Sequence, residues 1–192
     1  MIAIIKYNAG NIRSVQNGVS RLGYQSVITD DKNEILKADK VIFPGVGEAS
    51  SAMKYLKERE LDHLITSLKQ PVLGICLGLQ MMCNYSEEGN TGGLKIFDTV
   101  VRMFPQTDKV PHMGWNNFSS VKGDLFNGIS IEEDLYYVHS YYAEISSQTT
   151  AVCNYILPFS AAMQNGNFYG TQFHPEKSAD TGVRILNNFL QL

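Results

Sequence analysis

The stretch Pro71-Val72-Leu73-Gly74-Ile75-Cys76-Leu77-Gly78-Leu79-Gln80 decides the fold of this chain. Its apolar first half predicts a short buried strand over 71–75, and the glycines at 74 and 78 bracket Cys76 where the strand turns sharply into a helix. A thiol at such a turn takes the place that a serine nucleophile has in a nucleophile elbow. The stretch therefore predicts a cysteine nucleophile at the end of a buried strand.

Short strands alternate with helical patterns through the first half of the chain. The predicted strands span 2–6, 24–28, 40–43 and 71–75, and the predicted helices span 11–22 and 48–68. The helix over 48–68 is expected to break near Glu60. Alternation of this kind indicates a parallel sheet that is covered by helices on both faces.

The pattern changes after Tyr85. A polar, glycine-rich segment at 86–93 is followed by β-rich runs. We expect strands at 134–138, 150–155 and 167–172, and a last helix over 179–190 that packs Val183, Leu186, Phe189 and Leu190 against the core. The whole pattern predicts an α/β fold with an open, mostly parallel central sheet, helices on both faces, and antiparallel strands added by the second half. With no internal repeat, low-complexity tract or linker in the sequence, a single domain is expected over residues 1–192.

A second motif, Thr171-Gln172-Phe173-His174-Pro175-Glu176-Lys177, lies near the C-terminus. Residues two apart on a strand project from the same face, so a strand in this position would place the Glu176 carboxylate beside the His174 imidazole. Together with Cys76 these groups predict a nucleophile, its general base and the group that orients the base. The positive end of the helix dipole and a neighbouring imidazole both favour a thiolate, and the predicted reaction class is acyl transfer.

Each of these signals is weak when it is taken alone. A lone cysteine at the end of an apolar strand is more often a small buried hydrophobic residue, which is how we interpret Cys83, on the same helix, and Cys153. A lone histidine beside proline is usually structural, and a His-x-Glu pair on a strand is often only a salt bridge. The joint pattern of bracketing glycines, strand-to-helix context and a later His-x-Glu pair favours the catalytic interpretation.

The composition argues against several classes of function. A formal charge of −3 and a pI near 5.8 provide no broad basic surface, so nucleic acid is not an expected partner. The three cysteines lack the paired spacing of a zinc site, so we expect free thiols in a reducing cytoplasm and no metal. The segment Met1–Lys6 is interpreted as a core strand and not as a signal peptide, and no apolar run is long enough to span a membrane.

The segment Phe43-Pro44-Gly45-Val46-Gly47-Glu48 follows a predicted strand, at the edge where open parallel sheets bind ligands. A dinucleotide-binding fingerprint would need a third glycine where Ser50 stands. We therefore interpret Gly45-Val46-Gly47, called the strip below, as a source of backbone N–H groups for an oxyanion.

Two aromatic segments have less decided interpretations. Pro111–Asn116 contains the only tryptophan, Trp115, which favours an interface role about as much as partial burial. Tyr136–Tyr142 places four tyrosines around His139 and, in isolation, would be interpreted as ordinary sheet packing.

The elbow GICLGLQ, the strip within PGVG and the terminal QFHPEKS together resemble the class I glutamine amidotransferases. The resemblance covers the chain from about Ile4 to Phe189, with the motifs in the order and spacing of that family. It implies a flavodoxin-like α/β fold and a glutaminase reaction, with no cofactor expected. By this resemblance Cys76 attacks the side-chain amide of glutamine, His174 acts as general base and then acid, and Glu176 orients His174.

The resemblance also implies roles for residues around this triad. The Gly45-Val46-Gly47 strip and the Leu77 N–H are expected to form or help form the oxyanion hole. The positions expected to line the glutamine pocket are Gln80, His139, Ser140 and Tyr141. Trp115 and Lys177 match positions at the interface with a synthase subunit.

The motifs KYNAGNIRSV, PHMGWN and YYVHSYY resemble one branch of the family, whose members pass ammonia to a (β/α)8-barrel cyclase in histidine biosynthesis. We therefore expect a cytoplasmic heterodimer with such a cyclase, and L-glutamine as the substrate. One departure is that Lys6 and Asn8 stand where the family commonly has Asp and Gly. Because this change lies outside the triad, we expect glutaminase chemistry to survive and the Lys6 charge to be solvated or paired with a carboxylate.

Three other functions stay open from the sequence. A related subunit would donate ammonia to a synthase of pyridoxal phosphate, anthranilate or guanylate, although PHMGWN and YYVHSYY argue against these. A non-catalytic regulatory subunit with the same fold is disfavoured because all three triad residues are present. A cysteine peptidase would cleave peptides without any partner.

Overall fold

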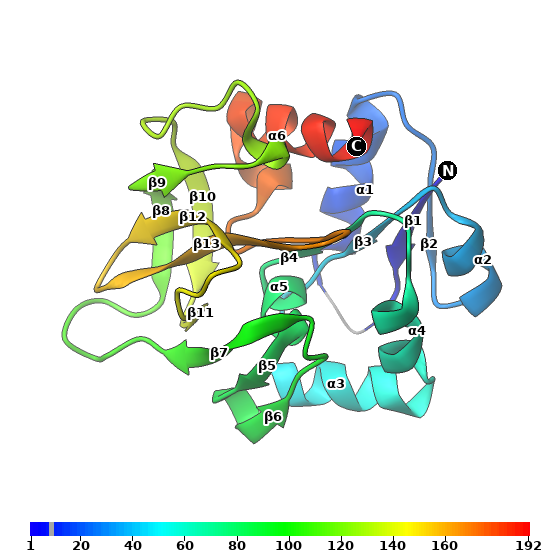
Figure 1. Ribbon diagram of the computed structural model, residues 1–192, viewed down its shortest axis with the longest axis horizontal. Coiled ribbons are helices and arrows are strands. Elements are labelled where there is room, and N and C mark those ends of the chain that lie inside the picture. The colour runs from blue at the N-terminus through cyan, green and yellow to red at the C-terminus, as the bar shows by residue number, and fades with distance from the viewer. Residues whose placement is uncertain (8–9) are drawn as a thin grey trace.

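An eight-stranded sheet runs through the middle of the computed structural model, which describes residues 1–7 and 10–192 (Figure 1). Its strands, in spatial order, are β2 (Ser26–Thr29), β1 (Ile2–Ile5), β3 (Lys40–Phe43), β4 (Val72–Ile75), β14 (Phe168–Thr171), β13 (Pro158–Asn165), β12 (Thr149–Asn154) and β9 (Ser120–Val121). Neighbours from β2 to β14 are parallel, and those from β14 to β9 are antiparallel. The predicted open sheet, parallel first and then antiparallel, is confirmed.

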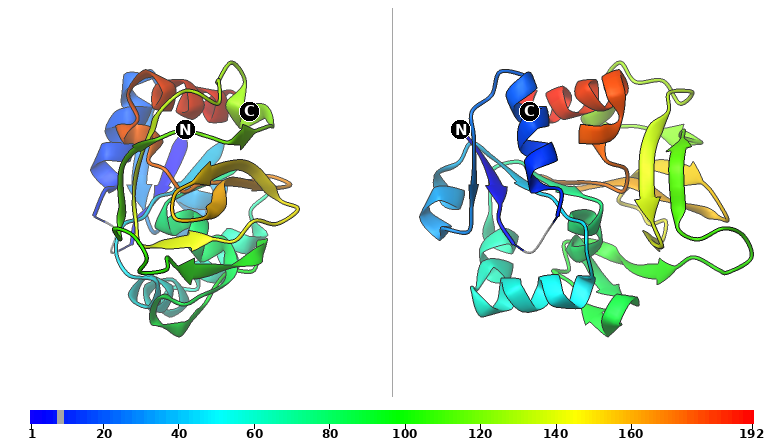
Figure 2. Two further views of the ribbon diagram at one scale, coloured as in Figure 1. Left: turned by 90° about the vertical axis from the view of Figure 1, so that its left-hand side faces the viewer. Right: turned by 180° about the vertical axis from the view of Figure 1, so that it is seen from behind.

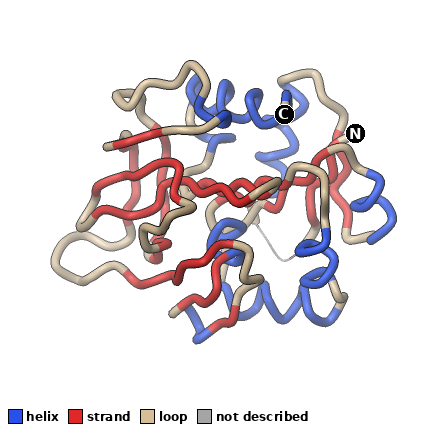
Figure 3. Tube along the Cα trace, viewed as in Figure 1, coloured by secondary structure: helices blue, strands red, loops and turns tan. Residues whose placement is uncertain are grey.

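Helices cover both faces of this sheet, as Figure 3 shows by colour. Above the sheet in Figure 1 lie α1 (Ile12–Arg21) and α6 (Ala179–Gln191), and below it lie α3 (Ala49–Glu58), α4 (Leu61–Ser67) and α5 (Leu77–Met82), with α2 (Lys32–Lys37) at the edge. The side-chain alternation of the strands sends Ile2 and Ile4 to the core beneath α1 and α6, and Ala3 and Ile5 to the opposite core. The parallel strands are therefore apolar throughout because both of their faces are buried.

The elbow depends on very close backbone packing between α5 and the sheet. A Cβ atom added to Gly78 would lie 1.9 Å from the carbonyl oxygen of Phe43 on β3, and one added to Gly74 would lie 2.8 Å from the carbonyl carbon of Gly78. The two glycines that bracket Cys76 therefore let the start of α5 sit directly on the strands. Glycine at these positions is explained by this close approach and not by the turn alone.

Two smaller sheets extend the second half of the chain. One pairs β8 (His112–Asn116) with β10 (Leu135–His139) in antiparallel register and is called the β8–β10 ribbon below. The other contains, in spatial order, β11 (Tyr141–Ala143), β7 (Phe97–Met103), β5 (Cys83–Ser86) and β6 (Thr91–Gly92). Single 3-10 turns form at η1 (Glu88–Asn90), η2 (Asp124–Phe126) and η3 (Pro175–Lys177). Figure 2 shows the ribbon at the edge of the molecule far from the N-terminus.

Most predicted elements are present within a residue or two of their expected ends. The break near Glu60 is confirmed, since this residue has φ 55° between α3 and α4. Two details were wrong. Cys83 is buried as expected but begins β5, because the N–H groups of Leu94 and Ile96 bond the carbonyls at the end of α5 and stop the helix. Val183 is 41% exposed and does not pack against the core, unlike the other apolar residues predicted for α6.

Within the described residues, none of the helices combines the length and the apolar character needed to cross a membrane.

Gly78→Ala is expected to lower the free energy of unfolding by about 1–3 kcal/mol, because the new methyl group must push α5 away from the Phe43 carbonyl. Urea denaturation of the two proteins measures the change. Gly92→Ala is the matched control, since a Cβ atom there would contact nothing within 4 Å, and it should shift stability by less than about 0.5 kcal/mol. Equal stability of Gly78→Ala and the wild type would contradict the close packing.

Candidate active site

Two strand ends bring the candidate site together. Strands β4 and β14 are parallel neighbours in which Thr171 pairs with Ile75, so their carboxyl ends lie side by side. Cys76 follows β4 directly, and its N–H donates a 2.7 Å hydrogen bond to the carbonyl of Thr171. His174 follows β14 after two further buried residues. The sheet register therefore joins two motifs that lie far apart along the chain.

Cys76 has the backbone geometry of an elbow. Its φ of 53° and ψ of −106° lie outside the regions that non-glycine residues normally adopt, and it forms the N-cap of α5. Conformations of this kind are costly and persist where the surrounding structure imposes them, which is common at active sites. The residue is only 6% exposed, yet it lines a cavity. The predicted elbow is present in the structure.

His174, Glu176 and Asn11 form a buried hydrogen-bonded group beside Cys76. His174 Nδ1 lies 2.9 Å from Glu176 Oε1, and the side chains of both residues are fully buried. Asn11 Nδ2 donates to the same carboxylate oxygen at 2.8 Å. Because a carboxylate only accepts hydrogen bonds, Nδ1 carries a proton and Nε2 is left for chemistry. His174 Nε2 is buried and has no hydrogen-bond partner among the described residues.

The charge state of His174 follows from opposing effects. Burial alone lowers the pKa of His174, but the negative charge of Cys76 and the hydrogen-bonded Glu176 carboxylate outweigh burial and raise it to about 10. The imidazole is therefore protonated at neutral pH when the sulfur is a thiolate. A thiolate–imidazolium pair of this kind provides both a nucleophile and a proton donor.

The local conformation around His174 differs from the sequence-based prediction. Strand β14 ends at Thr171, and the segment Pro175–Lys177 forms the 3-10 turn η3, so His174 and Glu176 do not share a strand face. The expectation of a strand at this point was wrong because Pro175 has no N–H for strand pairing and its fixed φ favours the start of a helical turn. The tight turn still places the carboxylate against the ring.

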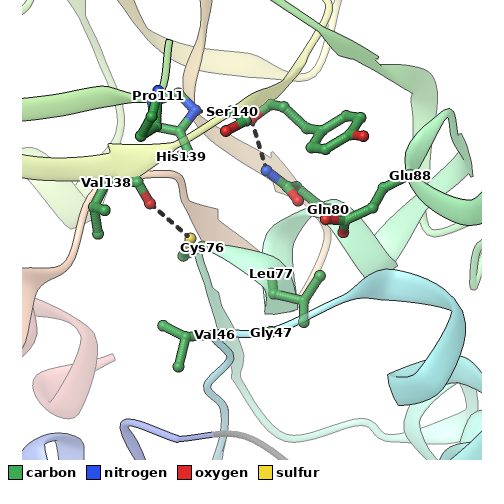
Figure 4. A pocket seen from close by; sticks show the side chains of 11 residues that line it. Val46, Gly47, Cys76, Leu77, Gln80, Glu88, Pro111, Val138, His139 and Ser140 are labelled. Atoms are coloured by element: carbon green, nitrogen blue, oxygen red, sulfur yellow. Dashed lines mark hydrogen bonds between the residues drawn. The ribbon is translucent and has the colours of Figure 1, made fainter.

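A cavity of about 270 Å³ opens beside the sulfur (Figure 4). The residues that line it are Val46, Gly47, Cys76, Leu77, Gln80, Glu88, Pro111, Val138, His139, Ser140 and Tyr141. The cavity thus includes every predicted pocket residue except Gly45, whose carbonyl accepts a hydrogen bond from the lining residue Leu77. His174 and Glu176 are not part of the lining, and their side chains are fully buried.

The strip makes a specific contact with the elbow. The Leu77 N–H donates a 3.3 Å hydrogen bond to the Gly45 carbonyl, so this predicted oxyanion donor already has a partner. Tyr7, whose hydroxyl bonds the Pro44 carbonyl, lies where a Gly45 side chain would project. The strip therefore has to turn its Gly45 carbonyl away before the Leu77 N–H can stabilise an oxyanion.

The two histidines that pair at one end of the β8–β10 ribbon are neutral. His139 Nδ1 lies 2.8 Å from the Tyr141 carbonyl, and its Nε2 lies 3.1 Å from His112 Nδ1. Burial lowers the pKa of His139 to about 3 and that of His112 to about 4. These rings therefore act as neutral hydrogen-bonding groups and supply no charge to the site.

Glu88, Asn11 and Gln172 reach the site without having been predicted. Glu88 on η1 lines the cavity and accepts a 2.9 Å hydrogen bond from the Ala49 N–H. Burial, together with the neighbouring Glu48 charge, raises the pKa of Glu88 despite that hydrogen bond. The sequence signal for Glu88 was its place in a polar, glycine-rich segment close after the elbow, whereas Asn11 and Gln172 offered only their membership of larger motifs.

The predicted interface residues gather on one exposed face. Trp115 is 55% exposed and makes an edge contact with Tyr136, with ring centroids 5.9 Å apart. Lys177 Nζ lies over the ring of Tyr136, 5.9 Å from its centroid. This cluster of Trp115, Tyr136 and Lys177 is called the ribbon face below. The ribbon face is joined to His174 by a backbone hydrogen bond, in which the main-chain N–H of His174 donates to the Tyr136 carbonyl at 3.0 Å.

Lys6 is exposed, which agrees with the expectation that its charge is solvated. A hydrogen bond from Tyr55, and to a smaller extent the Lys6 charge, lowers the pKa of Asp30. Asn8, the other departure from the family pattern, lies outside the described residues. Within those residues no group of three or more His, Cys, Asp or Glu side chains is arranged to hold a metal ion.

The proton on His174 provides a test of the ion pair. Because the thiolate raises the pKa of His174, the wild-type imidazolium should lose its proton only near pH 10, and Cys76→Ala should move this transition to lower pH. Histidine NMR titration measures both. Cys83→Ala, which removes a buried thiol at the far end of α5, should leave the transition in place. An unchanged transition in Cys76→Ala would show that the sulfur and the ring do not interact.

Comparison with known proteins agrees with this geometry. Residues 3–192 match the family described as glutamine amidotransferase class-I. Imidazole glycerol phosphate synthase subunit HisH of Bacteroides fragilis is 58% identical, with 100% of this chain and 99% of that protein aligned. The protein of the same name from Haemophilus influenzae is 46% identical, over 99% of this chain and 96% of its own length.

Solved structures share the fold at low sequence identity. A glutamine amidotransferase superimposes with a TM-score of 0.76 at 15% identity, covering 100% of this chain and 98% of that one. PurLQS from Thermotoga maritima gives 0.71 at 15% identity, covering 99% and 97%. The chain belongs to the class I glutamine amidotransferases, in the family of HisH subunits of imidazole glycerol phosphate synthase.

Proposed function

We propose that this chain hydrolyses L-glutamine through Cys76, His174 and Glu176 and delivers the ammonia to the cyclase subunit of an imidazole glycerol phosphate synthase. The observation that carries the proposal is the strained Cys76 elbow, which lines the cavity and lies close enough to the buried His174–Glu176 pair for its charge to raise the pKa of His174. The 58% identity to a HisH subunit supports the choice of synthase. A match of residues 3–192 to one family supports a single amidotransferase domain over 1–192.

Acylation begins with the ion pair. The Cys76 thiolate attacks the side-chain carbonyl carbon of glutamine, and the C–S bond forms as the carbonyl electrons move to oxygen. Protonated His174 then gives its Nε2 proton to the amide nitrogen, the C–N bond breaks, and ammonia leaves. Glu176 holds the ring in place through Nδ1 and stabilises its positive charge before the transfer.

Hydrolysis of the resulting thioester reverses the proton movement. Neutral His174 removes a proton from water as the water oxygen bonds the thioester carbon. The second tetrahedral intermediate collapses, the C–S bond breaks, and the Cys76 thiolate is restored beside an imidazolium. The new carboxyl group of glutamate loses its proton to solvent.

The polar groups of the cavity suit the amino-acid end of glutamine. The Glu88 carboxylate is half-buried in the wall and provides a negative charge for the α-ammonium group. Gln80 uses its Nε2 in hydrogen bonds to the Tyr141 carbonyl and Gln172, so its Oε1 stays available as an acceptor. Figure 4 shows Gln80 and Glu88 on the same side of the cavity, across from Val46. The substrate side chain then extends toward Cys76.

The partner's role in this account is to complete the oxyanion hole. The Leu77 N–H is occupied by the Gly45 carbonyl, so the isolated chain hydrolyses glutamine slowly until the strip turns. The ribbon face carries an exposed tryptophan, a tyrosine and a lysine, which are residue types that serve well in interfaces. A cyclase docked on it would receive ammonia close to the sulfur, since the Val138 carbonyl of this ribbon lies 4.0 Å from Cys76 Sγ.

Direct transfer matters because free ammonia in neutral water is mostly ammonium, which cannot act as a nucleophile. The proposed cyclase is a (β/α)8 barrel, and the proposed complex is a cytoplasmic heterodimer. A peptidase is disfavoured by the small cavity, whose volume of about 270 Å³ suits a single amino acid.

Cys76→Ala should reduce glutamine-dependent synthesis by the complex with the cyclase at least about a thousandfold, because the thioester cannot form. Synthesis supplied with ammonium salts should continue at the wild-type rate, since the cyclase chemistry is untouched. The measurements are glutamate release and product formation with each nitrogen source. Retained glutamine use would overturn the role of Cys76, and a wild-type complex unable to use glutamine would overturn the proposed function.

Glu88→Gln should raise KM for glutamine about tenfold or more and change kcat little, because the variant keeps an acceptor for the Ala49 N–H and loses only the charge that faces the α-ammonium group. Steady-state kinetics of the complex measure both constants. Glu87→Gln is the matched control, since Glu87 pairs with Arg102 outside the cavity, and its KM should not change. Equal KM values for all three proteins would exclude Glu88 from substrate binding.

A further inference from the structure

We propose that Gln172 is a positioning residue for the reaction, whose side-chain amide donates a hydrogen bond to the Cys76 sulfur and holds it as a thiolate at the cavity wall. The inference rests on the proposed function of Cys76 as the nucleophile. It assigns a role to a residue that lies outside both the cavity lining and the proposed triad.

Gln172 is placed in the sulfur's surroundings by the central sheet. It follows β14 directly, its N–H donates to the Ala161 carbonyl at 2.8 Å, and it is 0% exposed. Its Nε2 lies 3.5 Å from Cys76 Sγ, within hydrogen-bond range for sulfur. A long polar side chain that is wholly buried needs its hydrogen bonds satisfied, and this one directs a bond at the nucleophile.

The orientation of the Gln172 side-chain amide is set by a series of hydrogen bonds whose donors and acceptors are defined. The Tyr141 carbonyl can only accept, so the Gln80 group that lies 2.8 Å from it is the donor Nε2. The second hydrogen of Gln80 Nε2 is then donated over 3.0 Å to Gln172, which must present its Oε1. The Nε2 of Gln172 is therefore left facing the sulfur, and a flipped amide would set two donors against each other.

The Tyr141 carbonyl, from which this series of hydrogen bonds starts, has a second fixed partner. The neutral His139 ring donates its Nδ1 proton to the same Tyr141 carbonyl and accepts at Nε2 from His112 Nδ1. His112 Nε2 in turn accepts from Asn116 Nδ2 at 3.3 Å. The low pKa of His139, about 3, keeps the ring from gaining a second proton in the ordinary pH range. The donor and acceptor directions of these hydrogen bonds, including the orientation of the Gln172 amide, are thus the same in every protonation state of the triad.

Besides His174, two polar groups lie near the sulfur, and they favour opposite protonation states of it. The Val138 carbonyl, 4.0 Å from the sulfur, can accept a hydrogen bond only from a thiol S–H. The side-chain Nε2–H of Gln172, in contrast, binds a thiolate more strongly than a thiol. The shorter contact is the one to Gln172. The donor therefore stabilises the thiolate that attacks glutamine, and stabilises it again as the leaving group when water cleaves the thioester.

The test compares Gln172→Met, which removes the donor at similar length, with Gln172→Glu, which replaces it by a carboxylate of nearly the same shape. In both, the rate of Cys76 alkylation by iodoacetamide at pH 7 should fall about tenfold or more, and the pH profile of alkylation should move upward. Gln172→Glu should be the slower of the two above neutral pH, because its negative charge repels the thiolate. In the complex, kcat for glutamine should fall while KM stays the same.

Ser160→Ala is the control for loss of a buried hydrogen bond elsewhere in the sheet, since Ser160 bonds Thr149 and the Glu144 carbonyl. Its alkylation profile should match the wild type. A purely structural role for Gln172 predicts lower thermal stability with an unchanged profile and a milder effect for the isosteric Glu, and that result would overturn the proposal. Alkylation reports on the sulfur without glutamine turnover, so it is read separately from any failure of the proposed glutaminase function.

Discussion

The parallel pairing of β4 with β14 is the constraint on which the rest of the molecule depends. Its register sets Thr171 against Ile75 and lets the Cys76 N–H bond the Thr171 carbonyl at 2.7 Å. This register determines which residues meet at the site, because Cys76 follows one of the two strands, and Gln172 and His174 follow the other. A slip of one residue would turn each side chain to the opposite face of the sheet and separate the sulfur from the ring.

Hydrogen bonds link the ribbon face to the backbone of the proposed general base. The His174 N–H bonds the Tyr136 carbonyl, the Tyr136 N–H bonds Ser178 Oγ, and that hydroxyl donates to the His174 carbonyl at 2.6 Å. A protein that presses on Trp115 and Tyr136 therefore pushes on the backbone that carries His174. Among the described residues, the strip is joined to the elbow by one backbone hydrogen bond, the 3.3 Å bond from the Leu77 N–H to the Gly45 carbonyl, which makes the strip the part of the proposed site that is easiest to rearrange.

The sequence allowed the fold and the core of the candidate site to be predicted where local patterns carry the information. Glycines at fixed distances from Cys76 indicated the elbow, and alternating strand and helix periods indicated the parallel sheet. Asn11, Glu88 and Gln172 were missed because their roles arise only when segments far apart in the chain meet. The strand expected at His174 was wrong for a local reason, since Pro175 favours a turn over continued pairing.

A crystal structure of the chain after reaction with a glutamine analogue that carries an electrophilic carbon in place of the amide tests the central claim most directly. The account predicts a single thioether on Cys76 Sγ, with the amino-acid end beside Glu88 and Gln80 and with His174 Nε2 within hydrogen-bond distance of the sulfur or of the bound carbonyl group. A label on Cys83 or Cys153, or an imidazole that lies out of reach of the modified sulfur, would contradict it.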